Sequence, residues 1–120
     1  MSKKILIIDD EEDFLKAITI RLNHTGYDTY VALDGEEAYK IMEKEPPDLI
    51  ILDVEMPKMD GLQFIKRLKD DERYKNIPVI VLTAGAFDIA GEVDTLAIAQ
   101  DFLLKSVDNE RIIERVAKLI

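Results

Sequence analysis

The sequence predicts an α/β fold, in which a five-stranded parallel sheet carries helices on both of its faces. Two observations support this class. Short runs of Ile, Val and Leu without polar alternation are typical of strands that are covered on both faces. Segments with a helical hydrophobic period lie between these runs, so strand and helix alternate along the chain. The length of 120 residues suits a single domain, which we expect to span residues 1–120.

The predicted strands are short, and most of them are strongly apolar. The four solid apolar runs are Ile5–Ile8, Leu49–Leu52, Val79–Leu82 and Phe102–Leu104. The more mixed segment Tyr27–Leu33 is typical of a strand at the edge of a sheet. Periodicity alone does not separate the standard strand orders, but five strands favour the flavodoxin-like order 2-1-3-4-5, doubly wound in three layers.

The first predicted helix follows the first strand and carries a clear apolar stripe. Phe14, Ile18 and Leu22 recur at four-residue steps, and Gly26 ends the pattern. We therefore expect these three apolar side chains to face the core.

The remaining predicted helices have recognisable starts. Asp34 with Glu37 resembles a capping box, and the helix it begins ends near Lys44, before two prolines. Gly61 precedes a third amphipathic segment, and Asp108 can cap the last helix. The apolar faces of the third, fourth and fifth predicted helices are Leu62, Phe64, Ile65 and Leu68; Ile89, Val93, Leu96 and Ala97; and Ile112, Ile113, Val116 and Ile120.

Composition and charge exclude several classes of protein. The absence of cysteine excludes disulfides and thiolate metal sites and is compatible with a reducing compartment. With 25 acidic and 16 basic residues the net charge is −9, which disfavours direct binding to nucleic acid or to an anionic membrane. The N-terminus does not resemble a signal peptide, and no run approaches the about 18 apolar residues of a membrane span. We therefore expect a cytoplasmic protein.

Polar residues follow four of the predicted strands where each strand ends. Asp9 and Asp10 follow the first strand, Asp53 the third, Thr83 the fourth and Lys105 the fifth. Because ligands of open α/β sheets bind outside the carboxyl ends of the strands, we expect these side chains to converge on one crevice.

This set of side chains suits phosphoryl transfer assisted by Mg²⁺. Crowded carboxylates repel one another, and a hard divalent cation with oxygen ligands relieves that repulsion. Lys105 supplies a positive charge, Thr83 supplies a hydroxyl donor, and Asp53 is the best candidate for the nucleophile that forms an aspartyl-phosphate. Each position alone has an ordinary structural explanation, such as helix capping, so the prediction depends on the joint pattern.

Six motifs spread along the chain carry a family resemblance. They are Ile7-Ile8-Asp9-Asp10-Glu11, Asp34-Gly35-Glu36-Glu37-Ala38, Asp48-Leu49-Ile50-Ile51-Leu52-Asp53-Val54-Glu55-Met56-Pro57, Met59-Asp60-Gly61, Pro78-Val79-Ile80-Val81-Leu82-Thr83-Ala84 and Asp101-Phe102-Leu103-Leu104-Lys105. With these motifs the sequence resembles the receiver domains of bacterial response regulators, the two-component signalling family that includes the chemotaxis regulator.

The resemblance implies a role for each residue of the predicted site. Asp53 would accept a phosphoryl group from a phosphohistidine on a histidine kinase or a histidine phosphotransfer protein. Asp10 and Asp53 would bind Mg²⁺ directly together with the backbone carbonyl of Glu55, and Asp9 would bind it through water. Lys105 would pair with the phosphoryl oxygens.

The resemblance also implies a switch and a partner surface. Thr83 would turn its hydroxyl toward the phosphoryl group and Phe102 would turn inward. The surface of the fourth helix, fifth strand and fifth helix would then change for a downstream target protein or output domain. Leu15 and Ile20, which lie off the apolar stripe of the first helix, are expected to contact the bundle that carries the phosphohistidine, unless the last helix buries them. Ser106 stands where the family usually has proline.

Three other functions fit the residues less well. A Mg²⁺-dependent phosphatase of the haloacid-dehalogenase type also uses an aspartate nucleophile, but Asp53-Val54-Glu55 is a poor match to its Asp-x-Asp motif. A flavodoxin-like cofactor binder would need a Ser-, Thr- and Gly-rich loop where this chain has Asp-Asp-Glu-Glu. A receiver-like module that no longer uses phosphate is disfavoured by the intact acceptor, threonine and lysine. We therefore expect a phospho-acceptor switch that assists only its own phosphorylation and dephosphorylation.

Overall fold

The computed structural model describes residues 2–54, 61–83, 99, 101–105 and 108–120. Within these residues five parallel strands form one sheet in the order β2-β1-β3-β4-β5, which confirms the predicted order. The strands are β1 (Lys4–Ile8), β2 (Asp28–Ala32), β3 (Leu49–Asp53), β4 (Val79–Thr83) and β5 (Asp101–Leu104). The mixed segment predicted at an edge forms the edge strand β2.

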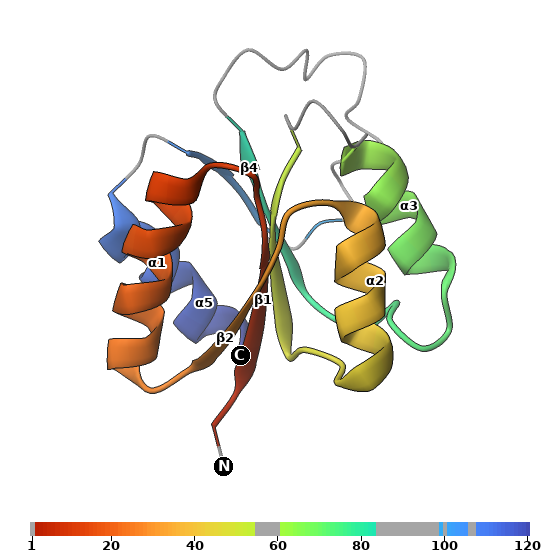
Figure 1. Ribbon diagram of the computed structural model, residues 1–120, viewed down its shortest axis with the longest axis horizontal. Helices are drawn as coiled ribbons and strands as arrows, with labels where there is room; N and C mark the ends of the chain where they lie inside the picture. The colour runs from red at the N-terminus through yellow and green to blue at the C-terminus, as the bar shows by residue number, and fades with distance from the viewer. Residues whose placement is uncertain (1, 55–60, 84–98, 100, 106–107) are drawn as a thin grey trace.

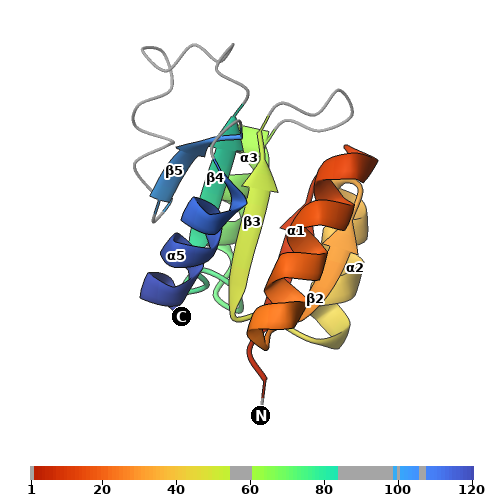
Figure 2. The same cartoon turned by 90° about the vertical axis from the view of Figure 1, so that its left-hand side faces the viewer.

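Helices cover both faces of the sheet and make three layers. The helices are α1 (Glu12–Thr25), α2 (Gly35–Lys44), α3 (Gly61–Asp70) and α5 (Asn109–Leu119). α1 and α5 lie on one face, and α2 and α3 lie on the other (Figure 1). Figure 2, turned by 90°, shows α1 and α5 in front of the sheet. The doubly wound, flavodoxin-like class is confirmed; the helix predicted around Ile89 and Val93 lies outside the described residues.

Each face of the sheet buries its own apolar cluster. Alternate residues of a strand point to opposite faces, so a sheet covered on both faces needs apolar side chains at every position. Every residue of β3 and β4 is accordingly buried. We call the group under α1 and α5 the first-face cluster; its strand residues are Ile5, Ile7, Leu49, Ile51, Ile80, Leu82 and Leu103. The group under α2 and α3 is the second-face cluster, with strand residues Leu6, Ile8, Ala32, Ile50, Leu52, Val79 and Val81.

Helix α1 faces the core with a different stripe from the one predicted. Its buried residues are Leu15, Ile18 and Leu22, whereas Phe14 is half-buried. The expectation that Leu15 lies off the core stripe is wrong, because this side chain is 8% exposed and belongs to the first-face cluster. Steps of three and four residues both suit a period of 3.6, and packing against the sheet selects a step of three from Leu15 to Ile18, followed by a step of four to Leu22. Ile20, in contrast, is 67% exposed.

The helix ends follow the capping residues that the sequence predicts. A carboxylate oxygen of Asp34 accepts a hydrogen bond of 2.8 Å from the N–H of Glu37 at the start of α2. Asp108 accepts one of 3.1 Å from the N–H of Glu110 at the start of α5. Gly26 ends α1 with a φ of 110°, a left-handed conformation that costs glycine little. Along the described ranges, no helix combines the length and the apolar character needed to cross a membrane.

Candidate functional site

The sheet brings the predicted site residues to one edge. The carboxyl ends of β3 and β4 point toward the top of Figure 1. The register of β1 against β3 places Asp9, which follows β1, beside Asp53 at the end of β3. Thr83 ends β4, and its carbonyl oxygen accepts a hydrogen bond of 2.6 Å from the N–H of Lys105. Parallel pairing therefore gathers chemistry-bearing residues that are far apart in the sequence.

Three carboxylates meet at this edge. Oxygen atoms of Asp9, Asp10 and Asp53 all lie within 4.8 Å of one another. Asp9 is 1% exposed and Asp53 is 5% exposed, whereas Asp10 is open to solvent. The cluster thus has a buried part at the ends of β1 and β3 and an exposed part beside it.

The ammonium of Lys105 bridges the two buried carboxylates. Its Nζ atom lies 3.1 Å from Oδ1 of Asp9 and 3.2 Å from Oδ2 of Asp53. A third carboxylate, that of Glu11, lies 3.6 Å away. Burial disfavours the ammonium, but the hydrogen bonds and charges of Asp9 and Asp53 outweigh that effect, so the pKa of Lys105 is raised. Lys105 therefore stays charged across the physiological pH range.

The carboxylate of Asp9 is only partly satisfied. Burial raises the pKa of Asp9, although the N–H of Glu11, 2.8 Å from Oδ1, and the ammonium of Lys105 both act to lower it. Oδ2 of Asp9 is buried and receives no hydrogen bond within the described ranges, although Lys105 forms an ion pair with it at 3.0 Å. This oxygen keeps lone pairs for a cation, and the carboxylate set offers the oxygen ligands that Mg²⁺ prefers. The residues present therefore fit such an ion.

The other predicted site residues occupy different positions. Thr83 is 1% exposed at the end of β4. Phe102 is half-buried on β5 and packs against the second-face cluster. Glu55 and Ser106 lie outside the described residues, so the predicted role of Glu55 stays a prediction.

Sequence reasoning missed two neighbours of Lys105. Its ammonium lies 4.9 Å from the centroid of the Phe14 ring and 3.6 Å from a carboxylate oxygen of Glu11. The sequence contained a signal for this proximity, because Glu11 and Phe14 come just after Asp9 and Asp10. The first turn of a helix that starts there must lie close to the carboxyl edge of the sheet.

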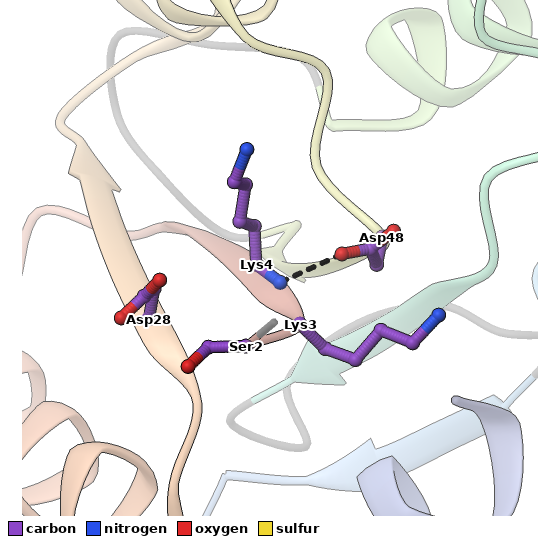
Figure 3. A pocket seen from close by; sticks show the side chains of 5 residues that line it. All are labelled: Ser2, Lys3, Lys4, Asp28 and Asp48. Atoms are coloured by element: carbon purple, nitrogen blue, oxygen red, sulfur yellow. Dashed lines mark hydrogen bonds between the residues drawn. The ribbon is translucent and has the colours of Figure 1, made fainter.

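A hollow lies at the opposite, amino edge of the sheet. Its volume is about 440 Å³, and it is lined by Ser2, Lys3, Lys4, Asp28 and Asp48. The backbone N–H of Lys4 donates a hydrogen bond of 2.7 Å to Oδ2 of Asp48. Figure 3 shows this hydrogen bond and the side chains of Lys3 and Lys4 pointing in different directions. The carboxylate of Asp48 thus holds the start of β1 to the segment before β3, which is a structural role.

Residues 5–117 match the family described as the response regulator receiver domain. The chain belongs to this family. It is 37% identical to the alkaline phosphatase synthesis transcriptional regulatory protein PhoP of Bacillus subtilis, over 100% of this chain and 49% of that protein. It is also 37% identical to sporulation initiation phosphotransferase F of the same organism, over 100% of this chain and 95% of that one. The chain spans about half the length of the first of these relatives.

Solved structures of response regulators superpose closely on this chain. The chemotaxis response regulator CheY4 of Vibrio cholerae superposes with a TM-score of 0.88 at 28% identity, over 100% of both chains. The response regulator TrrA of Thermotoga maritima, in complex with Mg²⁺ and BeF, gives 0.84 at 31% identity, over 98% of this chain and 99% of that one. Receiver domains of two-component response regulators are signalling switches that are phosphorylated on aspartate, bind Mg²⁺ at an acidic pocket and act with histidine kinases and output domains.

Proposed function

We propose that Asp53 is the residue of this receiver domain that accepts the phosphoryl group. The observation that carries the proposal is the arrangement around its carboxylate. Asp53 ends the central strand β3, shares the Lys105 ammonium with Asp9, and lies in a cluster whose carboxylate oxygens are within 4.8 Å of one another. Of the carboxylates in this cluster, Asp53 is the one that lies in the central strand of the sheet.

We propose that Mg²⁺ is held by Asp10 and Asp53 directly, by the backbone carbonyl of Glu55, and by Asp9 through water. The buried Oδ2 of Asp9, which receives no hydrogen bond from the described residues, supports this proposal. The ion would neutralise negative charge on the phosphoryl oxygens during transfer. The exposed carboxylate of Asp10 borders the solvent side, where an ion that keeps several waters would enter.

The proposed transfer forms one bond and breaks one bond. A carboxylate oxygen of Asp53 attacks phosphorus, and the P–N bond to the donor imidazole breaks as the O–P bond forms. The leaving nitrogen keeps the electron pair of the broken bond and takes up a proton. Lys105, now paired with the acceptor at 3.2 Å, would turn its ammonium to the phosphoryl oxygens, and Thr83 would donate a hydrogen bond from its hydroxyl.

We propose that the same residues form a switch that links this site to the surface. Thr83 and Phe102 lie on the neighbouring strands β4 and β5. The backbone hydrogen bond from Lys105 to Thr83 continues the pairing of these strands up to the site. Phe102 is half-buried, so an inward movement would bury more of its ring. We propose that this movement changes the surface of β5 and α5 for a downstream target protein or an output domain. The fourth predicted helix, which the family resemblance adds to this surface, lies outside the described residues.

The acceptor is tested by mass spectrometry after incubation with acetyl phosphate and Mg²⁺. We expect the wild-type protein to gain the mass of one phosphoryl group and Asp53→Ala to gain none. Asp70→Ala, which changes an exposed carboxylate on α3, is the matched control and should be labelled like the wild type. Labelling of Asp53→Ala at the wild-type level would overturn the proposal.

The partner surface is proposed to include Ile20. Its side chain is 67% exposed on α1, whereas Leu15, the other residue expected there, is in the core. We propose that Ile20 contacts the histidine kinase or histidine phosphotransfer protein that supplies the phosphoryl group. Ile20→Glu should slow transfer from such a protein donor and leave phosphorylation by acetyl phosphate unchanged, because the site itself is intact. Lys40→Glu, an exposed charge change on α2, is the control; equal slowing by both variants would argue against the docking role.

We propose that residues 1–120 form one receiver domain that acts in the cytoplasm as a switch and assists only its own phosphorylation and dephosphorylation. The absence of cysteine is compatible with a reducing compartment. Turnover of a general phosphatase substrate by the purified protein would contradict the proposal that it is a switch.

A further inference from the structure

We propose that Phe14 is a positioning residue that holds the Lys105 ammonium beside the acceptor site through a cation–π contact. This inference rests on the proposed function of Asp53 and Lys105. The Nζ atom lies 4.9 Å from the centroid of the Phe14 ring. That separation is inside the about 6 Å at which an aromatic quadrupole attracts a cation.

Helix α1 places the Phe14 ring where this contact is possible. The helix begins at Glu12, directly after the acidic segment that follows β1, so its first turn lies at the carboxyl edge of the sheet. Leu15 and Ile18 form the buried stripe, and Phe14 lies to one side of that stripe. Its ring is half-buried, packed against the first-face cluster, and close to Lys105. Packing against the core explains why the Phe14 side chain is half-buried, but it does not explain why the ring lies beside the Lys105 ammonium.

Lys105 is a side chain that needs such a contact. A lysine carries a compact charge on a flexible four-carbon stem, so its position depends on the groups around the ammonium. Among the described residues, those groups include the carboxylates of Asp9 and Asp53, the more exposed carboxylate of Glu11 at 3.6 Å, and the Phe14 ring. The side chain of Lys105 is only 13% exposed, which strengthens its electrostatic contacts.

Unlike the carboxylates, the Phe14 ring keeps its attraction for the ammonium during phosphoryl transfer. When a cation and a phosphoryl group engage Asp9 and Asp53, these carboxylates attract the ammonium less strongly. Glu11 would then draw the ammonium toward solvent. The attraction of the Phe14 ring does not depend on the charge state of the site, so it keeps the ammonium near the incoming phosphoryl oxygens.

Substitutions at Phe14 and Tyr27 separate the aromatic contact from packing. Phe14→Tyr keeps the aromatic face, whereas Phe14→Leu keeps an apolar side chain but removes the ring. Tyr27→Leu is the matched control, because Tyr27 is also a half-buried aromatic residue of the first-face cluster but lies next to the start of β2, at the other end of α1. Phe14→Met serves as a second ring-free variant if Phe14→Leu folds poorly.

The contact itself is tested by NMR spectroscopy of the protein without Mg²⁺. An aromatic ring at this distance shifts the proton resonances of the Lys105 ε-methylene group, which are assigned by comparison with Lys105→Arg. We expect the shift to persist in Phe14→Tyr and Tyr27→Leu and to disappear in Phe14→Leu. Identical Lys105 resonances in the wild type and in Phe14→Leu would overturn the inference.

The consequence for transfer is tested by the initial rate of phosphorylation by acetyl phosphate with Mg²⁺. We expect an about five-fold fall in Phe14→Leu, the effect of losing one partly buried cation–π contact, and rates within about two-fold of the wild type for Phe14→Tyr and Tyr27→Leu. An equal fall in Phe14→Tyr or in Tyr27→Leu would assign the effect to packing and overturn the inference. A wild-type protein that takes up no phosphoryl group would overturn the proposed function as well, whereas an active wild type with an equally active Phe14→Leu would overturn this inference alone.

Discussion

Asp10 differs from its two neighbouring aspartates because it is exposed and is not bridged by the lysine. Lys105 pairs with Asp9, Asp53 and Glu11, so its single charge is shared among carboxylates that also repel Asp10. Oxygens within 4.8 Å of one another repel noticeably even in a partly aqueous setting. The protein without metal therefore carries electrostatic repulsion at its carboxyl edge.

Replacing Asp10 should reveal this repulsion. We expect Asp10→Asn to stabilise the metal-free protein by about 1 kcal/mol, because it removes a charge near two buried carboxylates. The same change should reduce the stabilisation that Mg²⁺ gives, because a ligand is lost. Urea unfolding with and without Mg²⁺ measures both effects, with Asp70→Asn on α3 as the control. A metal-free Asp10→Asn protein that unfolds at lower urea than the wild type would contradict the prediction.

Single residues were predictable where the ends of strands determine their positions. Asp53 and Thr83 could be placed because they end solid apolar runs, and parallel strands end at the same edge. Phe14 and Leu15 could not be told apart, because both fit a helical stripe with Ile18 and only packing against the sheet distinguishes them. The contact between Phe14 and Lys105 depends on that same rotation of the helix.

Two glycines set the ends of helices for different physical reasons. Gly26 closes α1 with a φ of 110°, and a β-carbon there would meet nothing within 4 Å. A β-carbon on Gly61, the first residue of α3, would lie 2.6 Å from Cα and 2.9 Å from Cγ1 of Val54. Val54 directly follows Asp53, so the space at Gly61 bears on the position of the acceptor.

Substitution should separate these two reasons. Gly26→Ala should cost about 1 kcal/mol of stability, and Gly26→Asn less, because asparagine tolerates a left-handed conformation. Gly61→Ala should cost about 1–3 kcal/mol through overpacking, and Gly61→Asn more, because the larger side chain meets the same backbone. Urea unfolding of the four variants measures the order. A Gly61→Asn protein more stable than Gly61→Ala would contradict the steric explanation.

A polar cluster links β1, β2 and the end of α2 at the far side of the sheet from the site. The carboxylate of Glu45 forms an ion pair with Lys4 and accepts a hydrogen bond of 2.8 Å from the hydroxyl of Tyr30. The hydrogen bond from Lys4, followed by that from Tyr30, lowers the pKa of Glu45 from its ordinary value of 4.5. A carboxyl group with a lowered pKa stabilises the folded state above its ordinary pKa, and this stabilisation is lost as the pH falls through the folded value.

Glu45→Gln should therefore matter more near neutral pH than in acid. We expect the unfolding midpoint of the wild type to exceed that of Glu45→Gln at about pH 6 and the two midpoints to approach each other at about pH 3. Denaturant unfolding at both pH values measures the difference. A gap that widens in acid would show that the carboxylate is not held by these partners.

The bounds of strands and helices were predictable to within about one residue where an apolar run or a capping residue marks them. The run predicted at Leu49–Leu52 forms β3 at Leu49–Asp53, and the capping aspartate Asp34 directly precedes α2. The amino ends of the strands were less clear, since Lys4 and Asp101 are charged residues that still pair in the sheet. Charged side chains can point outward at the start of a strand, so polarity alone misplaces its first residue.

The molecule as a whole is stabilised most strongly at the centre of its sheet. Every residue of β3 and β4 is buried, whereas β2 and β5 lie at the edges and include exposed residues. The strand order could be predicted because few orders suit five parallel strands with helical crossovers, and not because of any periodicity. The distances among the site residues could not be predicted, since they depend on the register of four strands at once.

This gradient of burial should be visible in native-state hydrogen exchange. We expect backbone amides of β1, β3 and β4 to exchange most slowly, because they open only with the whole molecule, and those of β2 and β5 to exchange faster. Exchange monitored by NMR tests this order residue by residue. Protection of β5 equal to that of β3 would contradict this gradient.

The excess of negative charge at the carboxyl edge determines the order in which a cation and a phosphodonor bind to the site. Among the described residues, three clustered aspartates lie beside one ammonium, so this edge repels an anionic phosphodonor. A divalent cation that binds first reverses this repulsion and makes the edge attractive to the donor. We therefore expect ordered binding, in which the affinity for a small phosphodonor rises steeply with the concentration of free Mg²⁺.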